Sequence, residues 1–105
     1  GTRTIEIPPD VAEAFAEATS EATRNSLIHA VDATERSVTV QLSDDAVRVE
    51  VRDNGDGFDV RDVKPHRLGI QVSIRGRMAT IPGGVARVES HVHVGTLVVL
   101  EWVAS

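Results

Sequence analysis

Apolar residues recur along the chain with two periods, and the longer period predicts two helices. Between Asp10 and about Ala30, alanine- and glutamate-rich sequence carries apolar residues at helical spacing. This stretch predicts a helix about 30 Å long with Asp10 as its N-cap. Residues 68–81 repeat the helical pattern more loosely and stop at a Pro-Gly-Gly run, residues 82–84. They predict a second helix.

The shorter period, alternation of apolar and polar residues, predicts five strands. The first covers residues 2–7 and ends at two prolines, which cannot donate to a sheet ladder. The other four form two hairpins in sequence order. Residues 36–42 pair with residues 46–52, and residues 85–90 pair with residues 96–103 after a turn near Val94-Gly95.

The strand at residues 46–52 indicates that one face of the sheet is solvated. Its valines alternate with charged residues, so the valines face one way and Arg48, Glu50 and Arg52 face the other. Helices are therefore expected on a single face. Residues 53–67 show no clear period and predict a loop. The order of elements predicts an α+β fold, a two-layer sandwich with a mixed, mostly antiparallel sheet.

Composition limits the chain to one domain and excludes several kinds of partner. The 105 residues carry a formal net charge of -5 without a basic cluster, which argues against nucleic acid. There is no cysteine, so disulfides and thiolate zinc sites are excluded. The longest apolar run, residues 97–100, is far shorter than a membrane span. Because the sequence starts at Gly1, we expect residues 1–105 to be one domain of a longer, cytoplasmic or membrane-anchored protein.

Three polar residues of the first helix raise a question of chemistry. On a helical projection Glu21, Asn25 and His29 fall within about 80° of one another, in the same arc as Ala14 and Ala18. A buried carboxylate or amide without a partner costs roughly 1 to 3 kcal/mol. Either the three lie at the edge of the apolar stripe and contact water, or a polar group lies opposite them.

The segment "DNGDGF", residues 53–58, is the second candidate for chemistry. It places Asp53 at the end of a half-buried strand, where its carboxylate can accept a hydrogen bond from an amine. Gly55 and Gly57 can adopt positive φ and admit a close approach to the backbone. A plain turn is the alternative, but no strand follows directly, so a tight hairpin explains the segment poorly.

Four segments taken in order resemble the ATP-site boxes of one superfamily. "EATRNSLIHA", "RDNGDGF", "RLGI" and "GTLVVLEW" are similar to the boxes of the Bergerat-fold (GHKL) ATPases, which include DNA gyrase, the ninety-kilodalton heat-shock chaperone, mismatch-repair ATPases and bacterial histidine kinases. The short interval between the second and third boxes most resembles sensor histidine kinases of the nitrate-sensor and desaturase-regulator type. The resemblance implies the Bergerat fold and Mg-ATP as ligand.

The resemblance also implies roles for the three polar residues of the first helix. Asn25 matches the asparagine that holds Mg²⁺ through its amide oxygen, a hard ligand for a hard cation. Glu21 matches the acid that orients or activates a water or another attacking group. His29 occupies a position from which it would approach a phosphate. Under this interpretation the metal and the phosphates are the polar partner of all three residues.

The adenine side of the site follows from the second and fourth boxes. Asp53 matches the aspartate that reads the adenine amino group, directly and through water. Gly55 and Gly57 match glycines that let the nucleotide lie on the backbone, and Thr96 matches a threonine that helps to bind the adenine-side water.

The third box departs from the family pattern of Gly-x-Gly-x-Gly, because residues 65–69 read Pro-His-Arg-Leu-Gly. Arg67, Leu68 and Gly69 are the candidates for nucleotide contact there. Proline removes a backbone donor from a loop that would wrap phosphates, whereas a guanidinium can bind phosphate through its side chain. Arg67 therefore indicates either a substitute clamp or lost activity.

Together with the family resemblance, the sequence predicts that the chain is the catalytic domain of a sensor histidine kinase. Such a domain transfers the γ-phosphoryl group of Mg-ATP to a histidine on a separate helical domain, from which a response regulator is served. Two alternatives share the motifs: an anti-sigma-factor serine kinase, and a degenerate nucleotide-binding or interaction module without kinase activity.

Overall fold

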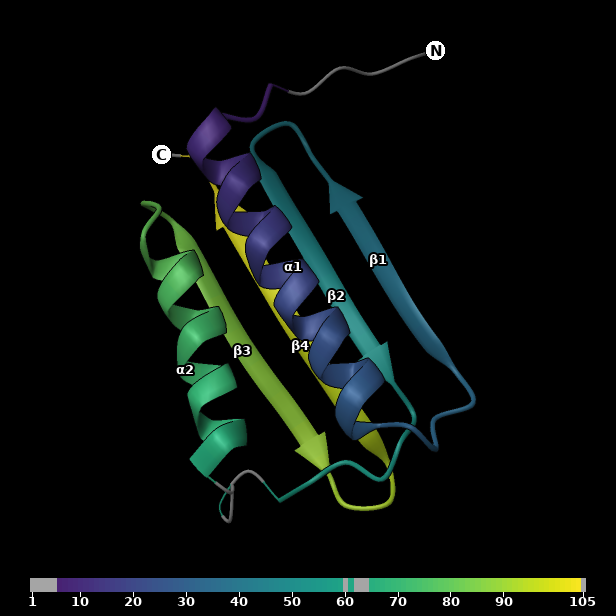
Figure 1. Cartoon of the computed structure of the whole chain (residues 1–105). Helices are drawn as coiled ribbons and strands as arrows, with labels where there is room; N and C mark the ends of the chain where they lie inside the picture. The colour runs from purple at the N-terminus through teal and green to yellow at the C-terminus, as the bar shows by residue number, and fades with distance from the viewer. Residues whose placement is uncertain (1–5, 60, 62–64, 105) are drawn as a thin grey trace.

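The computed structural model describes residues 6–59, 61 and 65–104, with the side chains of residues 65–68 excluded. Two helices cover one face of a four-stranded sheet (Figure 1). In chain order the elements are α1 (Pro9–His29), β1 (Arg36–Leu42), β2 (Ala46–Asp53), α2 (Pro65–Ala79), β3 (Gly84–His91) and β4 (Gly95–Val103). The two-layer α+β sandwich predicted from the sequence is confirmed.

The sheet has the strand order β1-β2-β4-β3, and its three pairings are antiparallel. Both predicted hairpins are present, and β2 and β4 lie side by side between them. The predicted strand at residues 2–7 falls largely outside the described residues, and Glu6 and Ile7 belong to no strand. The described sheet is therefore antiparallel throughout, and nothing in it tests the predicted mixed character.

Both helices begin at a proline, which corrects their predicted starts. α1 begins at Pro9 with Pro8 in the N-cap position and no side-chain cap, so Asp10 lies inside the first turn. The negative charge of Asp10 in the first turn interacts favourably with the helix dipole. α2 begins at Pro65 and ends at Ala79, whereas the pattern predicted residues 68–81. Proline suits the first helical turn, because its φ is already helical and that position needs no backbone donor.

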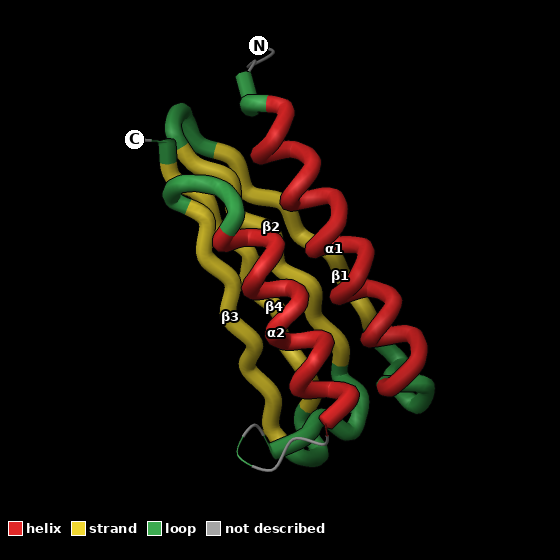
Figure 2. The backbone as a smooth tube through the Cα atoms, turned by 60° about the vertical axis from the view of Figure 1, so that its left-hand side comes forward, coloured by secondary structure: helices red, strands yellow, loops and turns green. Residues whose placement is uncertain are grey.

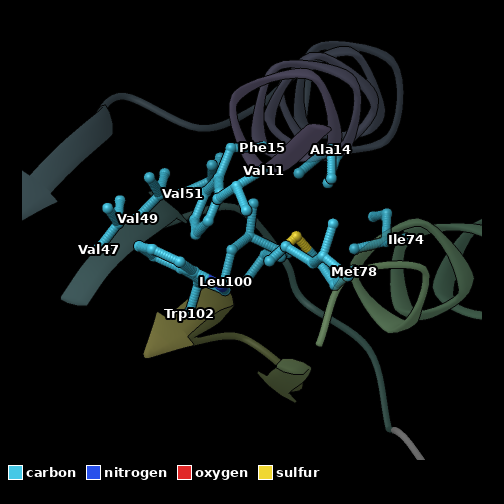
Figure 3. Close-up of a cluster of buried hydrophobic side chains, with 14 residues drawn as sticks. Val11, Ala14, Phe15, Val47, Val49, Val51, Ile74, Met78, Leu100 and Trp102 are labelled. Carbon is cyan, nitrogen blue, oxygen red and sulfur yellow. The ribbon is translucent and has the colours of Figure 1, made fainter. Parts of the chain in front are cut away.

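The core lies between the helices and the inner face of the sheet (Figures 2 and 3). Phe15 of α1, Met78 of α2 and Leu100 of β4 are buried there, at 8%, 0% and 0% exposure. α1 packs on β2 and β4, and α2 packs on β3 and against α1. Neither helix in the described part of the chain is long and apolar enough to span a membrane.

The outer face of the sheet carries the charged residues, as the alternation predicted. Val99 faces this side yet is only 1% exposed, because it pairs with Glu50 of β2 and Arg87 of β3. Long charged side chains cover apolar neighbours with their aliphatic portions.

Trp102 near the end of β4 is linked to the turn that follows α2. Its Nε1 donates a hydrogen bond to the Pro82 carbonyl oxygen at 3.1 Å.

Candidate functional site

The predicted site residues come from distant parts of the chain and gather at one end of the sandwich. The last turn of α1, the loop after β2 and the β3–β4 turn all lie at this end (Figure 1). A cavity of about 20 Å³ there is lined by Asn25, Ser26, His29, Ala30, Asp53, Gly57, Phe58 and Thr96. Five of these were predicted from the sequence: Asn25, His29, Asp53, Gly57 and Thr96.

Asp53 presents a buried, partly satisfied carboxylate to this cavity. It is 7% exposed, and it is the last residue of β2. Ser26 Oγ donates to Asp53 Oδ2 at 2.7 Å, and the Gly55 N–H donates to Oδ1 at 3.0 Å. A carboxylate offers about four acceptor positions, so both oxygens can accept a further hydrogen bond. The carboxylate is thus fixed in direction and still able to receive an amino group.

Ser26 is a site residue that the sequence interpretation missed. It is 6% exposed and bonds Asp53 across a sequence separation of 27 residues. One signal was available: Ser26 continues the buried series Ala18 and Ala22 at a spacing of four, so a hydroxyl had to lie on the buried side of α1.

Asn25 carries a polar atom that the described chain leaves without a partner. Its Oδ1 is buried and has no hydrogen-bond partner among the described residues. An amide oxygen in this condition costs roughly 1 to 3 kcal/mol. A hard cation such as Mg²⁺ binds oxygen ligands of this type, so the donor present fits a magnesium ion.

Glu21, one turn earlier on α1, does not line the cavity. Its Oε2 accepts hydrogen bonds from Ser73 Oγ at 3.1 Å and from Arg77 Nε at 2.9 Å, both on α2. Arg77 Nη1 also donates to Glu17 Oε2 at 2.6 Å. The sequence interpretation assigned the metal and phosphates as the polar partner of Glu21, whereas the structure gives it partners from the protein itself.

The glycines of the loop after β2 admit the protein's own chain. Gly57 has φ 63°, and a Cβ there would lie 2.2 Å from the His91 carbonyl oxygen and 2.9 Å from that of Gly95. A Cβ on Gly55 would lie 2.7 Å from the Ala30 Cβ. These contacts give both positions a structural need for glycine in addition to the predicted approach of a nucleotide.

The β3–β4 turn is bonded to the loop after β2. The His93 N–H donates to the Asp56 carbonyl oxygen at 2.6 Å. Ser90 is 4% exposed; its Oγ accepts from the Phe58 N–H at 2.9 Å and lies 2.8 Å from Thr96 Oγ1. Ser90 is a second residue that sequence reasoning missed, and no motif marked it. Thr96 is thus positioned at the cavity by β3.

The third box belongs to α2, where residues 65–69 form the first helical turns instead of a free loop. The side chains of Arg67 and Leu68 lie outside the described residues, so their predicted contacts remain predictions. Gly69 is exposed, and no atom of the described residues lies within 4 Å of where its Cβ would be.

A wider hollow of about 510 Å³ lies at the same end and includes outward-facing residues of the sheet. Arg52, Glu89 and His91 line it, and all three are exposed. Asp53 and Thr96 line both spaces. We assign the site to the smaller cavity, because it is lined by Asn25, whose buried oxygen lacks a partner within the described ranges, and by most of the predicted residues.

Comparison with known proteins gives a family and a fold. A family model described as "Histidine kinase-, DNA gyrase B-, and HSP90-like ATPase" matches residues 10–104. The Erythrobacter litoralis EL346 blue-light activated histidine kinase has the same fold, with a TM-score of 0.71 and 23% identity over 95% of this chain and 34% of that chain. The histidine kinase domain from that protein gives 0.68 and 24% over 94% and 48%. This chain spans less than half the length of either.

Proposed function

The chain belongs to the family of histidine kinase-, DNA gyrase B- and HSP90-like ATPases, and on this premise we propose that it is the ATP-binding catalytic domain of a sensor histidine kinase. The observation that carries the proposal is the pairing, around one cavity, of a fixed carboxylate and a buried amide oxygen that has no partner in the described part of the chain. These belong to Asp53 and Asn25.

Each group has a role in holding Mg-ATP. Asp53 accepts the adenine amino group, and Ser26 and Gly55 hold its carboxylate in the receiving direction. A guanine presents a carbonyl oxygen at the same position, which the carboxylate repels, so adenine is preferred. Thr96 orders the water beside the base. The neutral Asn25 amide holds the magnesium ion, which supplies charge stabilisation for the phosphates when bound.

On the phosphate side, His29 approaches a phosphate group, while Arg67, Leu68 and Gly69 form the start of the helix that would face the triphosphate. Backbone N–H groups at a helix N-terminus bind anions. Catalysis in this class comes mainly from positioning and from charge stabilisation.

Nucleotide entry requires the cavity to widen. A volume of about 20 Å³ holds a water molecule, which needs roughly 10–15 Å³, and is too small for a base. Phe58 and Gly57 form the wall that belongs to a loop, and the other lining residues belong to α1, the residue that follows it and the sheet. We propose that this loop wall moves outward when adenine binds.

The partners follow from the kinase assignment. The protein would be a sensor histidine kinase of the nitrate-sensor and desaturase-regulator type. Its acceptor is a histidine on a separate helical domain of the same protein, and the phosphoryl group then passes to a response regulator. The family model includes histidine kinases, and the two neighbours that share the fold are described as histidine kinases. We place the reaction in the cytoplasm.

The chemistry of the phosphorylated product tests this proposal. The protein with its natural flanking sequence is incubated with γ-labelled ATP and Mg²⁺, and the label is followed in acid and in alkali. Phosphohistidine is lost in acid and retained in alkali, and Asn25→Ala should abolish its formation. Acid-stable phosphoserine on a partner would instead indicate an anti-sigma-factor kinase. Binding of ATP without label transfer would indicate the inactive module that the glycine-poor third box also fits.

A further inference from the structure

The contact between α1 and α2 contains a charged cluster that the proposed nucleotide site does not use. Arg77 of α2 bonds two carboxylates of α1, Glu17 and Glu21, and Ser73 adds a second donor to Glu21. We refer to these four residues as the α1–α2 clamp. One member, Glu21, is the residue to which the family resemblance gives the role of orienting or activating an attacking group.

The clamp engages one of the two oxygens of the Glu21 carboxylate and turns the group toward α2. Glu21 Oε2 accepts two hydrogen bonds, one of them from a cation, and the carboxylate faces α2. The side chain of Glu21 is 23% exposed, against 48% for Glu17, so it is the more enclosed of the two carboxylates. Hydrogen bonding to Glu21 raises the pKa of Arg77 further above its usual value. An arginine is charged at any physiological pH, so the clamp always includes a cation.

Released from the clamp, Glu21 would be close to the phosphates. It precedes Asn25 by one turn, about 5–6 Å along α1. A carboxylate there can take a proton from a water whose oxygen bonds to the γ-phosphorus. The bond from that phosphorus to the β–γ bridging oxygen then breaks with its electron pair on ADP. The products are ADP, phosphate and a proton released to solvent.

We infer that Arg77, assisted by Ser73, is a positioning residue that withholds Glu21 from water and so preserves bound ATP for the phospho-acceptor. The inference rests on the proposed function, because it requires bound Mg-ATP. Under this inference the clamp selects between two attacking groups. Water needs Glu21 as a base and therefore attacks slowly, whereas an acceptor histidine attacks with its own nucleophilic nitrogen and does not need Glu21.

Removing the arginine should therefore increase ATP hydrolysis. Arg77→Met keeps the side-chain length and removes the charge. We expect its steady-state phosphate release to rise by about tenfold or more, up to the roughly 10²- to 10⁴-fold that a fully positioned general base contributes. The affinity for Mg-ATP, measured by calorimetry, should stay within about twofold, because the clamp does not line the cavity. Ser73→Ala should give a smaller rise.

Two further variants separate positioning from general loosening. Arg87→Met removes an arginine of similar exposure, 49% against 41%, that also bonds two glutamates but lies on the outer face of the sheet. It should leave hydrolysis unchanged. Arg77→Met combined with Glu21→Gln should return hydrolysis to the wild-type rate, because the base is gone.

The outcomes distinguish this inference from the proposed function. No rise in Arg77→Met, a rise that persists in the double variant, or lost ATP binding in Arg77→Met would overturn the inference while leaving the kinase proposal in place. Failure of the wild-type chain to bind Mg-ATP would overturn the kinase proposal itself. If Arg77→Met unfolds below the assay temperature, Ser73→Ala provides the same test.

Discussion

Asp53 shows how a single buried carboxylate can be prepared for a ligand. Its two oxygens each accept one bond, from Ser26 and from the Gly55 N–H, and each retains capacity for another. Asn25 is in the opposite condition, since its buried oxygen has no partner among the described residues. A carboxylate with spare acceptor capacity, such as Asp53, and a buried oxygen without a protein partner, such as that of Asn25, are both expected where a polar ligand binds.

The bond from Ser26 to Asp53 should be visible in stability. Ser26→Ala removes the donor to a carboxylate that is 7% exposed. Because hydrogen bonds to charged groups contribute about 1.5–3 kcal/mol, the free energy of unfolding should fall by an amount in this range. Denaturant unfolding measures it. Ser20→Ala, on the exposed side of α1, is the matched control and should change stability by less than about 0.5 kcal/mol. Equal effects in the two variants would contradict this account of Asp53.

Among the elements, the two loops at the site end act as one unit. The His93 N–H of the β3–β4 turn donates to the loop after β2, and the Phe58 N–H of that loop donates to Ser90 near the end of β3. Gly57 lies against His91 and Gly95 on either side of the turn. The cavity wall formed by Gly57 and Phe58 is therefore held by these contacts, so its proposed outward movement has to break the bond from the Phe58 N–H to Ser90 or carry the β3–β4 turn with it.

Two glycine substitutions test this packing. Gly57→Ala places a Cβ against a carbonyl oxygen at a residue with φ 63°, so it should destabilise the chain by at least about 1–2 kcal/mol from backbone conformation alone. Gly76→Ala, in α2 where no described atom lies within 4 Å of the new Cβ, should stabilise the chain by about 1 kcal/mol. Thermal unfolding compares them. Stabilisation in Gly57→Ala would show that the loop is not packed as described.

Periodicity predicted the elements because it reports local burial. The valines of β2 and the alternation in β4 located both hairpins, and the spacing in α1 located its buried side. Helix starts were misplaced, because Pro9 was interpreted as the end of a strand and Pro65 as part of a loop, whereas both lie in the first turn of a helix. The partners of Glu21 were beyond prediction, since Ser73 and Arg77 follow it by 52 and 56 residues and no motif connects them.

At the scale of the whole molecule, the two faces of the sheet carry different kinds of residues. The inner face holds the core and ends in the cavity, while the outer face carries an ion-pair network across three strands. Arg48 pairs with Glu50 at 2.8 Å and with Glu101 at 3.5 Å, and Arg87 pairs with Glu101 at 3.0 Å. This network lies on the side of the sheet away from the helices. It therefore stabilises the sheet, and substitutions in it should leave the cavity unchanged.

The outer network predicts a pH dependence of stability. Hydrogen bonding from Arg48 lowers the pKa of Glu50 in the folded chain. The stability from this pair is complete above the unfolded-state pKa of about 4.3 and is lost as the pH falls through the folded value. Arg48→Met should thus reduce the drop in unfolding midpoint between pH 7 and pH 3. Arg75→Met, at an exposed position of α2, should leave the drop unchanged. Identical drops in wild type and Arg48→Met would refute the role of the pair.

Calorimetric titration with ATP tests the central claim most directly, because the claim is that Asn25 and Asp53 meet around one Mg-nucleotide. The account predicts one site per chain, no binding by Asp53→Asn at millimolar nucleotide, and an affinity loss in Asn25→Ala of at least about tenfold, or 1.4 kcal/mol, only when Mg²⁺ is present. Binding that is unchanged in Asp53→Asn, or an absence of any magnesium-dependent binding in the wild type, would contradict it.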